Sequence, residues 1–324
     1  MKIIAELCQN HNGSIETVLN MIDECSEAGA THVKIQHILA KNVTYRVQFE
    51  EGGNDPISGV EYIKRPYKAE FERMLGLELS DEDVIRFIQH CNLKNVIPMT
   101  TCFCTEHASH LKKLGFKEIK VASYDCASHA MIKILRNNFD YIYISTGASF
   151  NGEIIKTAEI LDPINSAFLH CVTRYPTPLN ALNIGRMLWL KKFDRPVGFS
   201  DHSLKAKDGI SAIKIAIASG AEVVEAHYRI FPENQSKDGP VSINKAQLKE
   251  IKEFSILSNA EQLSIIQTEE LDKYMDTVNT KFNMSDEEYK NRLYFRGRFA
   301  SLVKNNGIEH HLFNWEDFQS SDLE

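Results

Sequence analysis

The sequence predicts an eight-fold β/α (TIM) barrel, because short apolar runs alternate with amphipathic helical segments and polar side chains follow the ends of the runs. Strands that alternate with helices form a parallel sheet with right-handed crossovers, and eight such units close into a barrel of about 250 residues. The runs expected to form the eight strands are residues 3–7, 32–36, 95–100, 118–121, 141–145, 167–171, 196–200 and 223–226.

The helical segments between these runs have recognisable beginnings and ends. Ser14 and Ser80 each precede an amphipathic segment, and we expect their hydroxyls to cap the helix N-terminus. Residues 206–219 are expected to form a single helix. Gly29 and Gly220 follow helical segments at positions where a glycine commonly ends a helix.

Two regions do not follow this alternation. Residues 37–79 are mixed in charge and contain glycines and prolines, so we expect an extended loop after the second strand, at the end of the barrel where loops cover a site. The polar, acidic segment after residue 257 is expected to be an appendage. The predicted division is a barrel domain, residues 1–257, and a C-terminal extension, residues 258–324.

Composition narrows the class of function. The 324 residues carry a net charge of −7 with acidic and basic residues interspersed, which favours a small-molecule substrate over nucleic acid or a membrane surface. No run approaches the roughly 20 apolar residues of a membrane-spanning helix, and the first residues do not resemble a signal peptide, so we expect a cytoplasmic protein. Seven cysteines without a CxxC pair argue against a disulfide framework or a structural zinc site.

Cationic and hydroxyl side chains gather at the predicted strand ends. A single lysine there is often only a surface charge, but Lys34 and Lys120 both lie inside apolar runs. Side-chain alternation places Gln36 on the same face as Lys34, toward the barrel mouth. Two inward cations among hydroxyls indicate a site for an anion, either phosphate or carboxylate. The hydroxyls at these ends belong to Thr100, Thr101, Ser123, Ser145, Thr146 and Ser200.

Two histidines end the last two predicted strands. His202 and His227 follow neighbouring strands, and Glu225 shares the face of His227. Two neutral imidazoles with a carboxylate and open positions suit a catalytic Mn, Fe or Zn ion, and Asp238 in the next loop is a candidate carboxylate. We expect Glu225 to take part in catalysis. Three further histidines lie on helical segments and are expected to be solvated: His107, His110 and His129.

The strings at these strand ends resemble those of the N-acetylneuraminate (sialic acid) synthase family, in order and spacing, from residue 2 to about residue 257. The matching strings are IIAELCQNHNGS, AGATHVKIQ, IKVASYD, ISTGAS, LHCVTRYPTP, VGFSDHS and GAEVVEAHY. The resemblance implies a metal-dependent condensation of phosphoenolpyruvate with an N-acylated hexosamine such as N-acetylmannosamine. Its products are a nine-carbon 2-keto-3-deoxy acid and phosphate.

The resemblance also implies a role for each matching position. The metal, Mn²⁺ in first place with Mg²⁺ or Co²⁺ as alternatives, would be held by His202 and His227. The partners implied are phosphoenolpyruvate, an amino-sugar aldehyde and a second copy of the chain as a homodimer. The residues implied for phosphoenolpyruvate are Lys34, Thr101, Lys120, Ser123, Ser145 and Ser200. Those implied for the sugar are Gln36, Asp125, Tyr175 and Asp238.

The sequence departs from the family in several places, of which two bear most directly on the site. Ala226 stands where many members have lysine or arginine, so a cation is expected to be missing near the metal. Residues 296–303 resemble the start of the antifreeze-like domain of the family, but the remaining residues are too few for a domain of roughly 60 residues. Two outcomes are compatible with this: either Arg296 or Arg298 takes the place of the arginine that this domain supplies, or the site stays more open and takes a different acceptor.

Two other functions remain compatible with the sequence. A pyruvate lyase or aldolase would form a Schiff base through Lys34 or Lys120, which borohydride trapping would reveal. A degenerate barrel would serve as a sugar-binding or assembly subunit, and Ala226 with the shortened extension favours that interpretation. Because both lysines and both histidines are present, the sequence favours the synthase.

Overall fold

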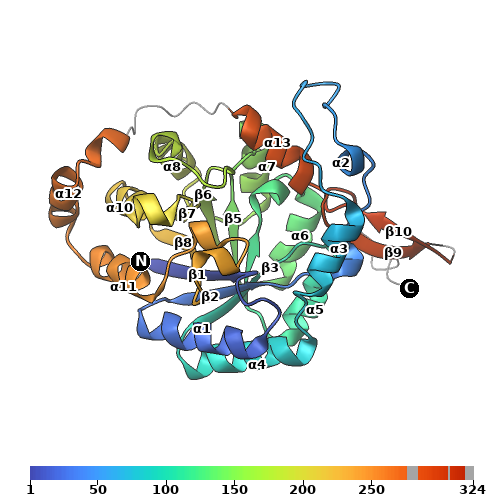
Figure 1. Cartoon of the computed structure of the whole chain (residues 1–324), viewed down its shortest axis with the longest axis horizontal. Helices are drawn as coiled ribbons and strands as arrows, with labels where there is room; N and C mark the ends of the chain where they lie inside the picture. The colour runs from blue at the N-terminus through green and yellow to red at the C-terminus, as the bar shows by residue number, and fades with distance from the viewer. Residues whose placement is uncertain (276–283, 306, 318–324) are drawn as a thin grey trace.

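The computed structural model describes residues 1–275, 284–305 and 307–317 of the chain, and eight parallel strands form a closed barrel in it (Figure 1). The strands pair in chain order, and β1 closes the ring against β8. The predicted strands are confirmed, with ends that differ by at most two residues. Their bounds are β1 Lys2–Cys8, β2 His32–Gln36, β3 Ile97–Thr101, β4 Glu118–Val121, β5 Tyr141–Ser145, β6 Ser166–His170, β7 Val197–Asp201 and β8 Val223–His227.

Helices surround the barrel and cover its outer face (Figure 1). The Ser14 and Ser80 hydroxyls accept hydrogen bonds from the amides of Thr17 and Asp83, which confirms both predicted N-caps. The helices that follow the barrel strands are α1 Ile15–Glu27, α4 Asp81–Leu93, α5 His107–Leu114, α6 His129–Asn138, α7 Asn151–Ile160, α8 Gly185–Lys191, α9 Lys205–Asp208, α10 Ser211–Ala218 and α11 Lys245–Ser255.

The expectation of a single helix over residues 206–219 is wrong. It is divided into α9 and α10 at Gly209, whose φ of 53° lies in the left-handed region that a continuous helix does not contain. Of these two helices, α10 is the one that packs closely against β7 and β8. The division leaves α9 beside the end of β7, where His202 lies.

Side-chain alternation along the strands separates the interior of the barrel into two layers. The lower layer is apolar and fills the barrel with Ile4, Met99, Tyr143, Ala167, Leu169 and Val223. These residues come from five strands. The next inward-facing position along each strand, two residues toward its C-terminal end, is occupied by Glu6, Thr101, Ser145, Cys171 or Glu225. The polar layer therefore rests on a packed apolar floor.

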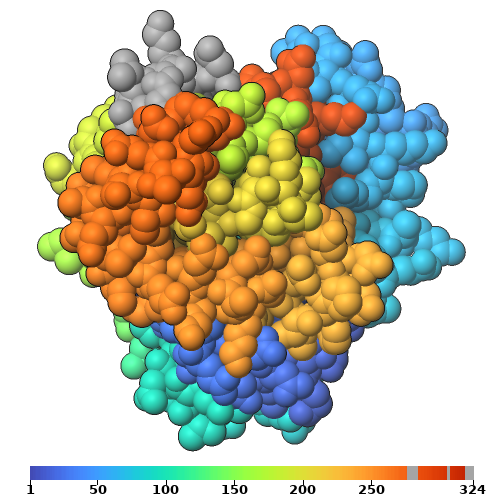
Figure 2. All heavy atoms as spheres, turned by 60° about the vertical axis from the view of Figure 1, so that its left-hand side comes forward, coloured from blue at the N-terminus to red at the C-terminus, as the bar shows by residue number. Residues whose placement is uncertain are grey.

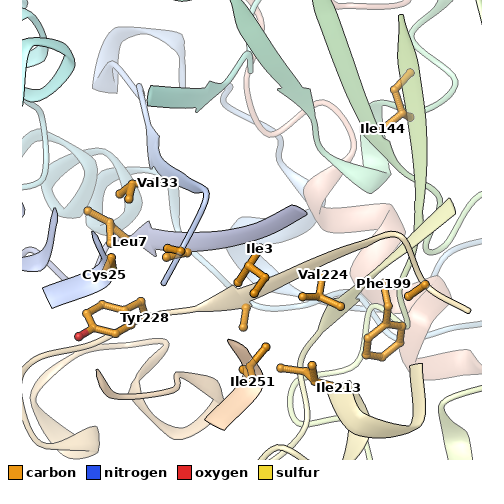
Figure 3. Close-up of a cluster of buried hydrophobic side chains, with 14 of the residues drawn as sticks. Ile3, Leu7, Cys25, Val33, Ile144, Phe199, Ile213, Val224, Tyr228 and Ile251 are labelled. Carbon is orange, nitrogen blue, oxygen red and sulfur yellow. The ribbon is translucent and has the colours of Figure 1, made fainter. Parts of the chain in front are cut away.

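The opposite faces of the strands pack against the helices. Ile3 and Val224 contact this larger core from the barrel, Ile213 from α10 and Ile251 from α11 (Figure 3). Gly198 in β7 allows a close approach of neighbouring strands, since a Cβ atom there would lie 2.4 Å from the carbonyl oxygen of Val223. The two cores together hold the strand ends in fixed positions around the barrel mouth.

Residues 37–79 are not the extended loop that we expected. They contain a 3₁₀ turn, η1 (Ala40–Asn42), and two helices, α2 (Gln48–Glu51) and α3 (Tyr67–Leu75). Val43 forms a β-bridge with Phe299 of the extension, so the segment is ordered by contacts that lie far away in the sequence. The segment with α2 and α3 lies against the C-terminal extension in both views (Figures 1 and 2).

The C-terminal extension folds back onto the barrel, and its described strands form a separate sheet rather than a ninth barrel unit. Its first helix, α12 (Asn259–Thr268), packs against α10. A further helix, α13 (Asp286–Phe295), precedes a two-stranded sheet of β9 (Ser301–Asn305) and β10 (Ile308–Leu312). We propose residues 1–257 as the barrel domain, with its boundary between α11 and α12. In the described ranges, none of the helices has the length and apolar character needed to cross a membrane.

Candidate active site

A cavity of about 710 Å³ opens at the C-terminal ends of the barrel strands. The residues to which the family resemblance gave a role all line this cavity, as does Glu225. Together they are Lys34, Gln36, Thr101, Lys120, Ser123, Asp125, Ser145, Tyr175, Ser200, His202, Glu225, His227 and Asp238. Thr100, Thr146 and Arg296, which the sequence also singled out, are not among the described residues that line this cavity.

The floor of the cavity is a buried charge cluster around Glu225. The Nζ atom of Lys120 lies 3.3 Å from one of its carboxylate oxygens, and that of Lys34 lies 3.5 Å from the other. Ser200 donates a hydrogen bond of 2.8 Å to the same carboxylate. Burial alone would raise the pKa of Glu225, but Lys120 and Lys34 hold it well below its usual range. Glu225 is therefore an ionised carboxylate between two lysines.

Lys34 has a second acidic partner, Glu6, at the end of β1. It also donates to the hydroxyl of Thr101 at 3.1 Å. Burial lowers the pKa of Lys34 to about 7, against the opposing effect of Glu225. Sequence reasoning assigned no role to Glu6. Its place on the inward face of β1, opposite Lys34 in the strand register, was the available signal.

His202 and His227 lie next to each other at the ends of the neighbouring strands β7 and β8. Their ring centroids lie 5.4 Å apart, and the Nδ1 atom of each is buried without a hydrogen-bond partner among the described residues. Burial, followed by the neighbouring His227, lowers the pKa of His202 to about 3, and burial lowers that of His227. Both imidazoles are therefore neutral at neutral pH, which is the form that binds a metal.

Two further side chains meet at His227. Cys8, Asp238 and His227 each offer a ligand atom, and these atoms lie within 4.8 Å of one another. The thiol of Cys8 donates to Asp238 at 2.8 Å. Sequence reasoning missed Cys8 as a site residue, although it follows directly on the run 3–7 that was predicted as the first strand and is the last residue of β1. Neutral imidazoles with free ring nitrogens beside a carboxylate are a donor set that fits a divalent transition metal.

Comparison with known proteins identifies the family of this chain. The model of the NeuB family matches residues 21–264. The chain belongs to the NeuB family. It is accordingly an enzyme of the phosphoenolpyruvate-condensing transferase type that forms a carbon–carbon bond.

Several proteins similar to this chain are named as synthases of legionaminic, pseudaminic or sialic acids. The chain is 29% identical to N,N'-diacetyllegionaminic acid synthase of Campylobacter jejuni, over 76% of this chain and 73% of the relative. It is 27% identical to pseudaminic acid synthase of the same species, over 92% and 81%. Its fold resembles the N-acetylneuraminic acid (sialic acid) synthetase of Leptospira borgpetersenii, with a TM-score of 0.67 and 24% identity, covering 86% of this chain and 92% of that one.

We expected Ala226 of this NeuB protein to leave the metal site without a nearby cation, and this expectation is wrong. Ala226 is buried in the core between barrel and helices, on the face of β8 opposite to Glu225 and His227. A side chain at this position points away from the cavity. The alanine therefore removes no charge from the cavity wall.

Besides Lys34 and Lys120, four cationic residues of the described ranges line the cavity: Arg65, Lys237, Lys290 and Arg298. Arg298, from the C-terminal extension, forms a buried ion pair with Glu70 of α3. Arg296 is not among the described residues that line the cavity, and it pairs with Glu153 at 3.1 Å. Of the two arginines that the sequence offered for the sugar, Arg298 is therefore the one placed to contact a ligand.

The extension also supports Asp125, a predicted sugar-binding residue. Asn314 donates to Asp125 at 3.1 Å, and Ser128 donates to it at 2.8 Å. Burial raises the pKa of Asp125, although both hydrogen bonds oppose the shift. Asn314 is buried and contacts the loop after β3, because its side-chain amide donates to the carbonyl of Phe103. No local pattern in the sequence distinguished this asparagine.

Proposed function

We propose that this NeuB protein condenses phosphoenolpyruvate with the open-chain aldehyde of an N-acylated hexosamine. C3 of phosphoenolpyruvate forms the new bond to the aldehyde carbon, whose oxygen takes up a proton. Water adds to C2, and phosphate leaves with the electrons of its bond to C2, so that a nine-carbon 2-keto-3-deoxy acid results. The observation that carries this proposal is a buried pair of lysines directly beside two neighbouring, neutral histidines in one cavity.

Phosphoenolpyruvate fits the floor of the cavity. It carries a carboxylate and a phosphate, and such groups are bound by preorganised cations and hydroxyls in a site that excludes water. Lys34 and Lys120 supply the cations. The Ser145 hydroxyl is buried without a hydrogen-bond partner among the described residues, so it is free to donate to a bound anion. Thr101, Ser123 and Ser200 complete this set of donors.

A divalent metal, with Mn²⁺ as our first choice, would be held by His202 and His227, with Asp238 and Cys8 beside it. When bound, it supplies a Lewis acid that polarises the acceptor aldehyde. Glu225 is ionised and adjoins both lysines, so it would hold their ammonium groups in place for the substrate anion. Gln36, Asp125 and Tyr175, together with Arg298, would face the hydroxyl and acyl groups of the acceptor.

The direct test is turnover by the purified chain with Mn²⁺, phosphoenolpyruvate and a panel of N-acetylated and diacetamido aldehyde sugars. We expect phosphate release with at least one acceptor, and a product whose mass equals the sum of both substrates plus water minus phosphoric acid. Absence of phosphate release across the panel, with Mn²⁺ bound to the protein, would contradict the proposal and favour a degenerate barrel.

One observation favours the Schiff-base alternative, namely that burial brings the pKa of Lys34 down to about 7. An amine of that pKa is partly neutral at neutral pH and attacks carbonyl groups. The contacts of Lys34 with Glu6 and Glu225 oppose such an attack, because they favour the charged ammonium. Borohydride reduction in the presence of pyruvate separates the two functions: the aldolase gives a covalent lysine adduct, and the synthase gives none.

A further inference from the structure

A second cluster of histidines lies outside the catalytic cavity. His37 follows β2, Asp81 is the first residue of α4, and His107 and His110 lie one turn apart on α5. None of the four is among the described residues that line the cavity. The expectation that His107 is solvated is wrong, since only 6% of its surface is exposed, and His37 is 5% exposed.

Three of these side chains already approach one another closely enough to share an ion. The ligand atoms of His37, Asp81 and His110 lie within 4.8 Å of one another. Nε2 of His110 is 2.9 Å from a carboxylate oxygen of Asp81. The ring of His107 packs edge-on against that of His37, with centroids 5.4 Å apart. The helical spacing of His107 and His110 places both on one face of α5.

The buried nitrogens of this cluster lack partners. Nδ1 of His37 and both ring nitrogens of His107 have no hydrogen bond within the described part of the chain. Glu106 approaches Nε2 of His107 to 3.2 Å without the alignment of a hydrogen bond. A buried imidazole nitrogen without a partner is costly, and an ion that shares its lone pair removes this cost. Burial, then His107 and His110, lowers the pKa of His37 to about 4, so its lone pair is available.

We propose that His37, Asp81 and His110 bind a divalent transition-metal cation of the zinc type, with His107 as the neighbouring fourth imidazole. Imidazoles with one carboxylate select zinc, nickel, cobalt or copper over magnesium and calcium. His37 is fixed by its burial, while His110 and Asp81 have side chains 42% and 57% exposed, which leaves them room to close around the ion. The cation would join the start of the 37–79 segment to α4 and α5.

Counting bound zinc on the full chain tests this proposal. Zinc also suits His202 and His227, so the informative quantity is the difference in bound zinc between the wild type and variants of the second cluster. We expect His110→Asn and Asp81→Asn each to bind one zinc fewer per chain than the wild type. Equal zinc content in the wild type and both variants would overturn the proposal.

The chain offers a matched control in His90 on α4. His90 pairs with Asp23 at 2.7 Å, just as His110 pairs with Asp81. Asp23 also contacts Lys94, a cation that does not bind metals, where Asp81 has a histidine. His90→Asn is expected to keep the zinc content of the wild type. Thermal unfolding without metal establishes that each variant folds. Added zinc should then raise the unfolding temperature less in His110→Asn than in His90→Asn, and an equal rise would count against the site.

Discussion

Lys120 and Glu225 form a buried ion pair, 3.3 Å long, that joins β4 to β8 across the interior of the barrel. Three strands lie between β4 and β8 in either direction around the ring, so the contact exists only because the barrel is closed. Removing one partner of a buried ion pair leaves the charge of the other partner uncompensated. The ammonium group of Lys120 that pairs with Glu225 can also bind an anionic substrate placed beside it. The pair therefore prepares a charged group for ligand binding before the ligand arrives.

Replacing Lys120 tests its role in binding phosphoenolpyruvate. We expect Lys120→Met to lower kcat/KM for phosphoenolpyruvate by roughly 100-fold or more, because one preorganised donor to the substrate anion is lost. The measurement is steady-state phosphate release at saturating acceptor. Lys112→Met is the control, since Lys112 is exposed and pairs with Asp140 on the surface. An unchanged kcat/KM in Lys120→Met would exclude the lysine from the anion site.

The neighbouring histidines predict a specific loss of metal binding. His202→Ala should abolish phosphate release and weaken Mn²⁺ binding measured by calorimetry, because one of two neutral imidazole ligands is removed. Tyr175 contacts Nε2 of His202 at 3.0 Å, so this variant also frees the tyrosine hydroxyl. His129→Asn, a partly exposed change outside the cavity, is expected to retain both properties. Full Mn²⁺ affinity in His202→Ala would contradict the assigned metal site.

The two arginines of the extension should behave differently. Arg298→Lys keeps a positive charge near Glu70 but loses the planar guanidinium, so we expect a several-fold higher KM for the acceptor sugar and a smaller change in kcat. Arg296→Lys should leave both constants near those of the wild type, because Arg296 pairs with Glu153 away from the cavity. The reverse order of effects would assign the sugar contact to Arg296.

Glu70 predicts how stability depends on pH. Burial alone would raise its pKa, but Arg298 and Arg73 lower it from 4.5 to about 2. A carboxylate whose pKa is depressed on folding stabilises the fold fully above its unfolded pKa, and this contribution is lost as the pH falls through its folded pKa. The free energy of unfolding of the wild type should therefore fall between about pH 5 and pH 2.

Glu70→Gln removes this contribution at every pH. We expect a loss of about 3–5 kcal/mol at neutral pH, since Arg298 remains buried without its partner, and a weaker decline below pH 5. Denaturant unfolding at several pH values measures both effects. Glu72→Gln, an exposed change on the same helix, is the matched control and should lie within about 0.5 kcal/mol of the wild type. Equal acid sensitivity of both variants would show that Glu70 is not the responsible group.

Much of the cavity could be predicted because a strand has a side-chain period of two. Once 32–36 and 223–226 are strands of a barrel, Lys34 and Glu225 must point inward at the mouth. The same rule places Ala226 outward, so the cation expected there could have been rejected from the sequence alone. Cys8 lies beyond the regular part of β1, where the register shifts, and alternation gives no guidance there.

The sequence by itself determined the barrel, the strand ends and the inward polar residues, because these follow from hydrophobic periodicity within short segments. Only the tertiary structure decided which segments of the chain surround these polar residues. Four contacts join residues that lie far apart in the chain. The extension packs over the 37–79 segment, Arg298 pairs with Glu70, Asn314 supports Asp125, and His37 approaches His110. Such contacts depend on the closed barrel bringing distant segments together, and no local pattern encodes them.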